Sequence, residues 1–84
     1  MSERFFIYGR ESCPFCIYAI DFCKAKKIEY YFIDCSKLEG FADECKAFYG
    51  QNTVPIILSN DLFSGKTIKI GGYTDLLEYF DEGN

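Results

Sequence analysis

The chain has 84 residues, of which 49% are hydrophobic, 19% aromatic and 26% charged, and its formal net charge is −4. This length suits one domain, residues 1–84, and the composition excludes a disordered protein. Basic side chains cluster only at residues 24–27, so the charge balance argues against nucleic-acid binding.

The N-terminus is polar, and the first apolar run is only four residues long. This start resembles neither a signal peptide nor a membrane span, so we expect a cytoplasmic protein with no membrane partner. Of the residues, 5 are cysteines, an odd number that argues against a secreted disulfide framework. We therefore expect the thiols to be mostly reduced in the cell.

The first half of the chain predicts a strand, a helix and a second strand. Residues 5–8 form the first apolar run, and apolar residues recur at helical spacing from Pro14 to about Lys26. Cys13 then falls at or next to the helix N-cap. The nearly continuous apolar run at residues 28–33 predicts a strand that is parallel to the first and covered on both faces.

The second half predicts a helix, a hairpin and a last helix, which completes the order βαβαββα of an α/β fold. The helix at residues 40–49 ends at Gly50, and residues 56–58 and 66–70 are expected to pair through a loop longer than the minimum. The inward face of this helix is predicted to be Phe41, Ala42, Cys45, Phe48 and Tyr49. In the last helix, at about residues 74–80, the inward residues are predicted to be Leu76, Leu77 and Phe80.

The motif Cys-Pro-Phe-Cys at residues 13–16 places two thiols at a helix start. Unpaired backbone N–H groups at that end stabilise a thiolate, which is the form that attacks disulfides. Cys13 is the predicted nucleophile, whereas Cys16, one turn inside, is better suited to resolve a mixed disulfide. Two buried structural thiols or half of a zinc site are the alternatives, but the chain has no His and no second short Cys spacing.

Two further segments are candidates for binding a thiol compound. Residues 53–55 read Thr-Val-Pro before a strand, and a cis Val54-Pro55 bond would turn the backbone of Val54 outward, where an extended thiol peptide could pair with it. Residues 71–75 read Gly-Gly-Tyr-Thr-Asp, which suits a turn and an N-cap in which Asp75 pairs with Glu78. The same helix start could bind a carboxylate, and Asp75 an ammonium group.

These three motifs, in this order and spacing, resemble those of the dithiol glutaredoxins over essentially the whole chain. The resemblance implies a thioredoxin-like fold, in which about three helices flank a four-stranded mixed sheet and a cis proline precedes the third strand. It also implies a thiol-disulfide oxidoreductase that uses glutathione as electron donor and needs no metal. Its partners would be protein disulfides or glutathionylated proteins, and we expect a monomer.

The resemblance also implies roles for individual residues. Cys13 and Cys16 would be catalytic. The glutathione-binding set would be Arg10, Phe15, Gln51, Thr53, Val54, Pro55, Gly72, Thr74 and Asp75. Within this set, Arg10 and Gln51 would bind the glycine carboxylate, the backbone of Val54 the cysteine part, and Thr74 with Asp75 the γ-glutamyl end. Phe15 stands where the family most often has Tyr, so a hydroxyl donor is missing there.

Three more cysteines, Cys23, Cys35 and Cys45, are expected to be structural, and Cys35 to be the most exposed of them and open to an adventitious disulfide. Two other functions stay open. One is a glutaredoxin-like thioredoxin that is reduced by a protein reductase. The other is a carrier that holds an iron–sulfur cluster between two copies through Cys13 and glutathione, which the Pro between the cysteines disfavours.

Overall fold

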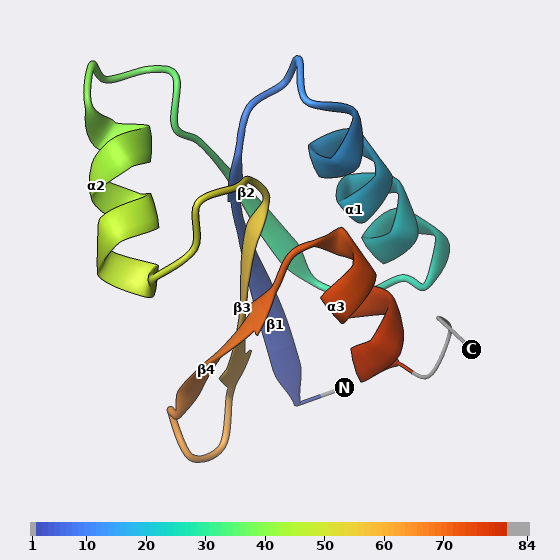
Figure 1. Ribbon diagram of the computed structural model, residues 1–84. Helices are drawn as coiled ribbons and strands as arrows, with labels where there is room; N and C mark the ends of the chain where they lie inside the picture. Colours follow the sequence, from blue (N-terminus) through green and yellow to red (C-terminus); the bar gives the residue numbers. More distant parts are fainter. Residues whose placement is uncertain (1, 81–84) are drawn as a thin grey trace.

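The computed structural model describes residues 2–80, which form one four-stranded sheet and three helices (Figure 1). The elements in chain order are β1 (Glu3–Gly9), α1 (Pro14–Ala25), β2 (Tyr30–Asp34), α2 (Phe41–Tyr49), β3 (Ile56–Asp61), β4 (Thr67–Gly71) and α3 (Tyr73–Tyr79). The predicted order βαβαββα is therefore confirmed. None of the described helices combines the length and apolar character that a membrane crossing requires.

The sheet is mixed, and its strand order is β2-β1-β3-β4. β1 runs parallel to β2, while β3 runs antiparallel to both β1 and β4. The crossover through α1 allows β1 and β2 to run parallel, and the short turn after β3 allows β3 and β4 to run antiparallel. This is the mixed four-stranded sheet of the thioredoxin-like fold that the sequence predicted.

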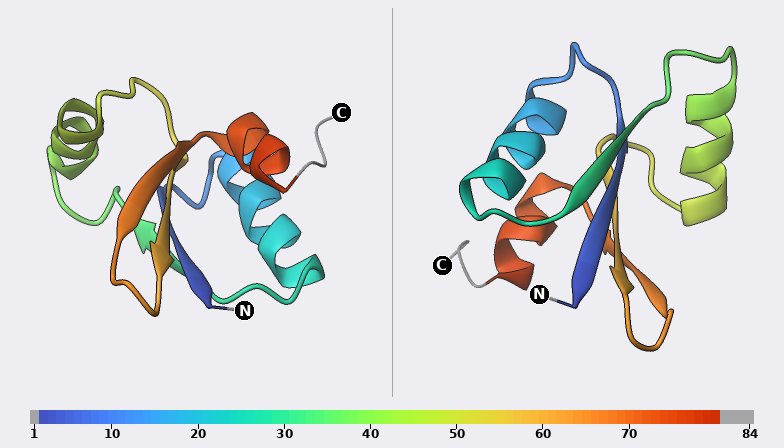
Figure 2. Two further views of the ribbon diagram at one scale, coloured as in Figure 1. Left: turned by 90° about the horizontal axis from the view of Figure 1, so that it is seen from below. Right: turned by 180° about the vertical axis from the view of Figure 1, so that it is seen from behind.

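The helices cover the two faces of the sheet unequally: α1 and α3 lie together on one face and α2 lies alone on the other (Figures 1 and 2). The larger buried cluster lies under α1 and α3 and contains Phe5, Ile7, Ala19, Cys23, Ile28, Ile57 and Leu76. The smaller one lies under α2 and contains Cys35, Cys45 and Ile56, with Tyr8, Phe41, Ala42 and Tyr49 packed against it. The residues around Cys45 thus form a small core of their own.

Two predictions about burial are wrong. The second strand is not covered on both faces: none of the residues of β2 is buried, and Tyr31 is 46% exposed and stacks on Phe6 with ring centroids 5.6 Å apart. Phe48 is 81% exposed rather than inward-facing. It lies at the margin of the apolar stripe of α2, where its ring meets Tyr49 edge-on at 4.9 Å without entering the buried cluster.

β3 continues to Asp61, three residues beyond the predicted strand end at Leu58, because its buried polar residues have partners. Ser59 donates a hydrogen bond to the Glu3 carboxylate (2.5 Å). The Asn60 amide donates to Thr67 Oγ1 (3.0 Å) and accepts from Arg4 Nε (3.0 Å). Satisfied polar groups can stay inside a sheet. The loop between β3 and β4 therefore covers residues 62–66, which is longer than the two-residue minimum, as predicted.

Candidate active site

The two thiols of the Cys-Pro-Phe-Cys motif lie at the start of α1, in different surroundings. Cys13 is the N-cap residue with extended backbone (φ −86°, ψ 120°), and Pro14 opens the helix. Cys13 is partly exposed, whereas Cys16 is fully buried. The predicted difference between an accessible first thiol and an internal second thiol is therefore present in the structure.

The last residue of β1 makes room for the Cys16 sulfur. A Cβ atom at Gly9 would lie 2.4 Å from Cys16 Sγ, far inside van der Waals contact. The sequence reasoning gave Gly9 no role, although it comes directly before the loop that leads to the thiol motif. Its missing side chain is what lets the buried thiol lie against the end of the strand.

The surroundings drive the pKa values of the two thiols apart. Burial by itself raises the pKa of Cys13, but hydrogen bonds from the backbone and thiol of Cys16 and from the Phe15 backbone outweigh it, and the Arg10 charge adds to them, so the net shift is downward. The pKa of Cys16 is raised to about 12, first by burial and then by its contact with Cys13. Cys13 is consequently the thiol that ionises.

The segment before β3 lies beside Cys13. The Val54-Pro55 peptide bond is cis, and the Cys13 thiol lies 3.8 Å from the Val54 carbonyl oxygen, to which it donates. This contact joins two of the three sequence motifs across the end of the sheet. It also puts the backbone of Val54 within reach of anything bonded to the Cys13 sulfur.

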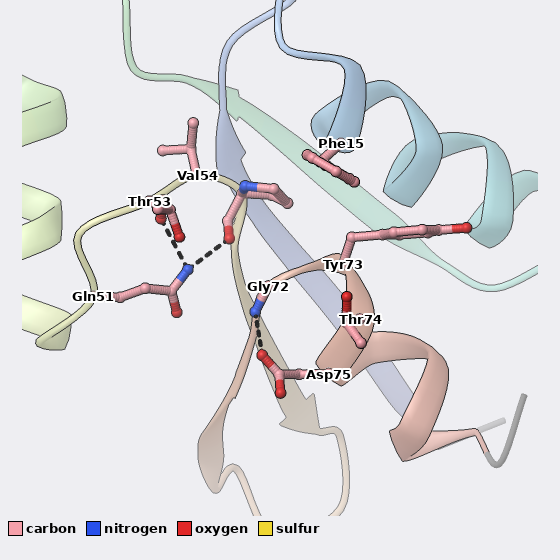
Figure 3. Close-up of a pocket in the computed structure, with 9 residues that line it drawn as sticks. Phe15, Gln51, Thr53, Val54, Gly72, Tyr73, Thr74 and Asp75 are labelled. Atoms are coloured by element: carbon pink, nitrogen blue, oxygen red, sulfur yellow. Dashed lines mark hydrogen bonds between the residues drawn. The ribbon is translucent and has the colours of Figure 1, made fainter. Parts of the chain in front are cut away.

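Gln51 holds this segment in shape. Its side-chain amide nitrogen donates to the carbonyl oxygens of Thr53 (2.9 Å) and Pro55 (2.8 Å), as Figure 3 shows. Both hydrogens of that nitrogen therefore have partners inside the loop. Gln51 thus positions the loop, and its role toward a carboxylate stays a prediction.

A cavity of about 380 Å³ opens between this loop, α1 and α3 (Figure 3). Its lining consists of Phe15, Gln51, Thr53, Val54, Pro55, Gly72, Tyr73, Thr74 and Asp75. All of the predicted glutathione-binding residues except Arg10 line it. Arg10 is exposed and acts on the site through its charge, which lowers the pKa of Cys13.

Tyr73 lines the cavity although the sequence reasoning gave it no role. Its ring centroid lies 6.2 Å from that of Phe15 and 5.7 Å from that of Tyr18, and the last two are 5.9 Å apart. These rings make an aromatic wall between α1 and α3. The available signal was its position inside the Gly-Gly-Tyr-Thr-Asp motif, in the first turn of a helix that faces the thiol motif.

Asp75 closes the opposite end of the cavity. Its Oδ2 accepts a hydrogen bond from the Gly72 backbone N–H (2.8 Å), so the capping partner of Asp75 is Gly72 and the predicted pairing with Glu78 is wrong. A carboxylate offers about four acceptor positions, so this single bond leaves capacity for an ammonium group. Gly71, at φ +123°, permits the approach, because a Cβ there would lie 2.4 Å from Asp75 Oδ2.

The remaining cysteines are all buried. Cys23 is 0% exposed, Cys35 1% and Cys45 7%, so the prediction that Cys35 is the most exposed is wrong. The Cys35 backbone N–H bonds to the Gly9 carbonyl oxygen (2.7 Å), which extends the pairing beyond β2 and holds the side chain under α2. Among the described residues, no group of three or more His, Cys, Asp or Glu side chains could hold a metal ion.

Comparisons with known proteins agree with this geometry. The sequence profile of the glutaredoxin family matches residues 5–63. No curated protein sequence matches the chain. The solution structure of glutaredoxin from Brucella melitensis superimposes with a TM-score of 0.67 at 28% identity, over 95% of this chain and 80% of that one.

Two more distant structures share the fold. The buckwheat glutaredoxin-glutathione complex has a TM-score of 0.73 at 20% identity, over 98% of this chain and 72% of that one. Glutaredoxin 1 from Francisella tularensis, complexed with cacodylate, has a TM-score of 0.69 at 24% identity, over 95% of this chain and 94% of that one. Since the family profile matches more than half of the sequence, and the fold is that of these structures, the chain belongs to the glutaredoxin family.

Proposed function

We propose that the protein is a glutathione-dependent thiol-disulfide oxidoreductase that reduces protein disulfides and mixed disulfides with glutathione. The observation that carries this proposal is the position of the Cys13 thiol. It is partly exposed, has a lowered pKa and lies 3.8 Å from the Val54 carbonyl oxygen beside the cavity. Nucleophile and binding site for a thiol peptide are thus adjacent.

The reaction begins at Cys13. Its thiolate attacks one sulfur of a disulfide, a new S–S bond forms to Cys13, and the other sulfur leaves as a thiolate that takes up a proton. Cys16 stays protonated at this stage, because its pKa is about 12, and its thiol donates a hydrogen bond that stabilises the Cys13 thiolate. A lowered pKa on the attacking sulfur is what allows the step at neutral pH.

The mixed disulfide is resolved along one of two routes. Cys16 loses its proton and attacks the Cys13 sulfur, which releases the substrate as a thiol and leaves a Cys13–Cys16 disulfide for two glutathione molecules to reduce. Alternatively, glutathione attacks a glutathionylated Cys13 directly. Contact with Cys13 is one of the causes of the high pKa of Cys16, so ionisation of Cys16 becomes easier once Cys13 no longer carries a charge.

The cavity provides groups of the right chemistry for glutathione. The Val54 backbone would pair with its cysteine part, and Asp75 would bind the γ-glutamyl ammonium group at the helix start. Arg10 is the cation that we assign to the glycine carboxylate. The aromatic wall formed by Phe15, Tyr18 and Tyr73 would exclude water from one side of the bound peptide.

Two cysteine variants test the chemistry. Cys13→Ser should abolish reduction of the mixed disulfide of glutathione and 2-mercaptoethanol, measured as NADPH consumption with glutathione reductase. Cys16→Ser should keep most of that activity and lose reduction of insulin disulfides, which needs the second thiol. Equal losses in the two variants would contradict the assigned roles. Turnover with thioredoxin reductase but none with glutathione would favour the thioredoxin-like alternative.

The glutathione cradle has its own test in Asp75→Asn. An Asn carbonyl can still accept the Gly72 N–H, so the fold should be kept while the negative charge is lost. For an exposed pair we expect a loss of about 0.5 to 1 kcal/mol, which is a 2- to 5-fold higher KM for glutathione. Unchanged glutathione kinetics in a stable variant would remove Asp75 from the binding site.

A further inference from the structure

A second pair of thiols lies on the other face of the sheet, under α2. Cys35 follows β2 directly and Cys45 lies in the middle of α2, and the two share one buried cluster with Ile56. The Cys35 thiol donates to the Ile33 carbonyl oxygen (3.8 Å), and the neighbouring Cys45 thiol contributes to the raised pKa of Cys35. The sequence gave no sign of this pair, because its members are ten positions apart and belong to different elements.

Tyr8 packs against the same cluster and lines the same cavity as Cys45. Its pKa is raised to about 12, mainly by burial and by its hydrogen bond with Tyr49, and further by the charges that Cys45 and Cys35 would carry when ionised. Both thiols therefore lie close to one phenol on β1. Three segments of the chain bring these groups together, so the thiols meet through the tertiary fold.

One of the two thiols can be reached from outside. Cys45 lines a surface cavity of about 290 Å³, whereas Cys35 lies behind it, 1% exposed. The other lining residues of this cavity are Tyr8, Phe41, Glu44, Phe48 and Tyr49. A small oxidant that enters between these side chains would meet the Cys45 sulfur first.

We propose that Cys35 and Cys45 are a second redox pair, which a low-molecular-weight disulfide such as glutathione disulfide converts into an intramolecular disulfide. Cys45, as a thiolate, attacks one sulfur of glutathione disulfide and releases one glutathione. Cys35 then loses its proton and attacks the Cys45 sulfur, which releases the second glutathione. Two protein thiols are oxidised by two electrons, and one glutathione disulfide is reduced to two thiols.

The second pair reacts more slowly than the active site. Cys45, the attacking thiol, is only 7% exposed, whereas Cys13 is partly exposed, so an oxidant reaches the second pair less readily. Formation of the second disulfide therefore requires prolonged oxidation. The pair would respond to lasting oxidation rather than to each catalytic cycle.

The disulfide would tie α2 to the end of β2. α2 is continuous through Gly50 with the loop at residues 51–55, which lines the active-site cavity. The Cys35 backbone also bonds to Gly9, which lies against the Cys16 sulfur. A disulfide under α2 would therefore restrain both the loop at residues 51–55 and the end of β1 at Gly9, which position the active site.

Tryptic mapping tests the proposal directly, because the lysines separate the cysteines. Residues 11–24 contain Cys13, Cys16 and Cys23, residues 28–37 contain Cys35, and residues 38–46 contain Cys45. The full chain is incubated with glutathione disulfide for increasing times, alkylated after denaturation, digested and analysed by mass spectrometry. We expect peptides 28–37 and 38–46 to appear joined, after the internal disulfide of peptide 11–24.

Variants provide the controls. Cys35→Ala and Cys45→Ala should each abolish the joined peptides and leave the internal disulfide in 11–24, while Cys23→Ala should change neither. Cys23 is the matched control, because it is also buried with a pKa raised to about 11 but belongs to the other buried cluster. Amide exchange in α2 should slow by roughly tenfold in the oxidised wild type and in Cys23→Ala only.

Several results would overturn the proposal. One is full alkylation of Cys35 and Cys45 in protein whose peptide 11–24 is oxidised. Others are separate glutathione adducts on the two cysteines, or a link between two chains seen as a dimer on a non-reducing gel. Because peptide 11–24 is read in the same digest, each of these results leaves the proposed active-site chemistry standing.

Discussion

Gly71→Ala perturbs two features of the α3 start at once. Gly71 has φ +123°, a conformation that L residues rarely adopt, and a Cβ there would lie 2.4 Å from Asp75 Oδ2 and 2.8 Å from its Cγ. The Asp75 side chain would have to turn away. It would then lose its hydrogen bond to the Gly72 N–H, which now measures 2.8 Å.

The expected loss of stability combines these two effects. The unfavourable backbone costs about 1 to 3 kcal/mol, and loss of the cap adds about 1 kcal/mol. A domain of this size has roughly 5 to 15 kcal/mol of folding free energy in total, and each kilocalorie lowers Tm by about 4 to 8 °C. Gly71→Ala should therefore lower Tm by about 8 to 32 °C, measured by circular dichroism, and should raise KM for glutathione.

Gly65→Ala is the matched control. Gly65 has φ +76° and no atom within 4 Å of the position of its Cβ, so this change carries a backbone cost of about 1 to 2 kcal/mol and no clash. Both variants gain the same entropy benefit in the unfolded chain, so it cancels in the comparison. Equal destabilisation by the two changes would refute the assigned contact with Asp75.

A double-mutant cycle isolates that contact. Asp75→Ala alone should cost about 1 kcal/mol through loss of the cap. With Gly71→Ala already present the same change should cost almost nothing, because the cap is lost only once and the closest clash is removed. Strict additivity in urea unfolding would mean that Asp75 and Gly71 act independently.

Two further predictions concern charge and burial. The alkylation rate of Cys13 by iodoacetamide should rise with pH to a plateau, with a midpoint below the ordinary thiol value of about 8.5. Arg10→Gln should move that midpoint upward, whereas Arg10→Lys should keep it; a midpoint unmoved by Arg10→Gln would rule out the role of its charge. Phe48→Ser should change the free energy of unfolding by at most about 0.5 kcal/mol, while Phe41→Ala, part of the α2 contact, should cost about 2 kcal/mol in the same urea titration. A large loss with Phe48→Ser would show that its ring is buried in solution.

The fold was predictable because each element carries a clear local signal. Proline at the start of α1, Gly50 after α2 and the alternation in β4 fix the type and order of the elements, since these patterns depend on near neighbours. Which residues of each element are buried was less predictable. The apolar run of β2 predicts a fully covered strand. Its position at the edge of the sheet and the exposure of its side chains depend on tertiary packing, which the run does not reveal.

The site was predictable to the extent that it consists of short motifs. All three motifs contribute residues to the lining of one cavity, as their order and spacing predicted. Sequence reasoning did not predict the hydrogen bonds that Gln51 makes to its own loop, or the space that the missing side chain of Gly9 leaves for Cys16. Neither kind of contact can be recognised from the periodicity of the sequence.

The contrast between the two thiols of the motif also depends on tertiary contacts that the motif does not contain. Burial opposes a thiolate at Cys13, but hydrogen bonds from the backbone and thiol of Cys16 and from the Phe15 backbone outweigh it, and the Arg10 charge adds a smaller contribution. Cys16 in turn can be buried because Gly9, on a different element, leaves space for its sulfur. The motif itself therefore supplies the hydrogen bonds that lower the pKa of Cys13, whereas the burial that raises the pKa of Cys16 depends on the end of β1 packed beneath it.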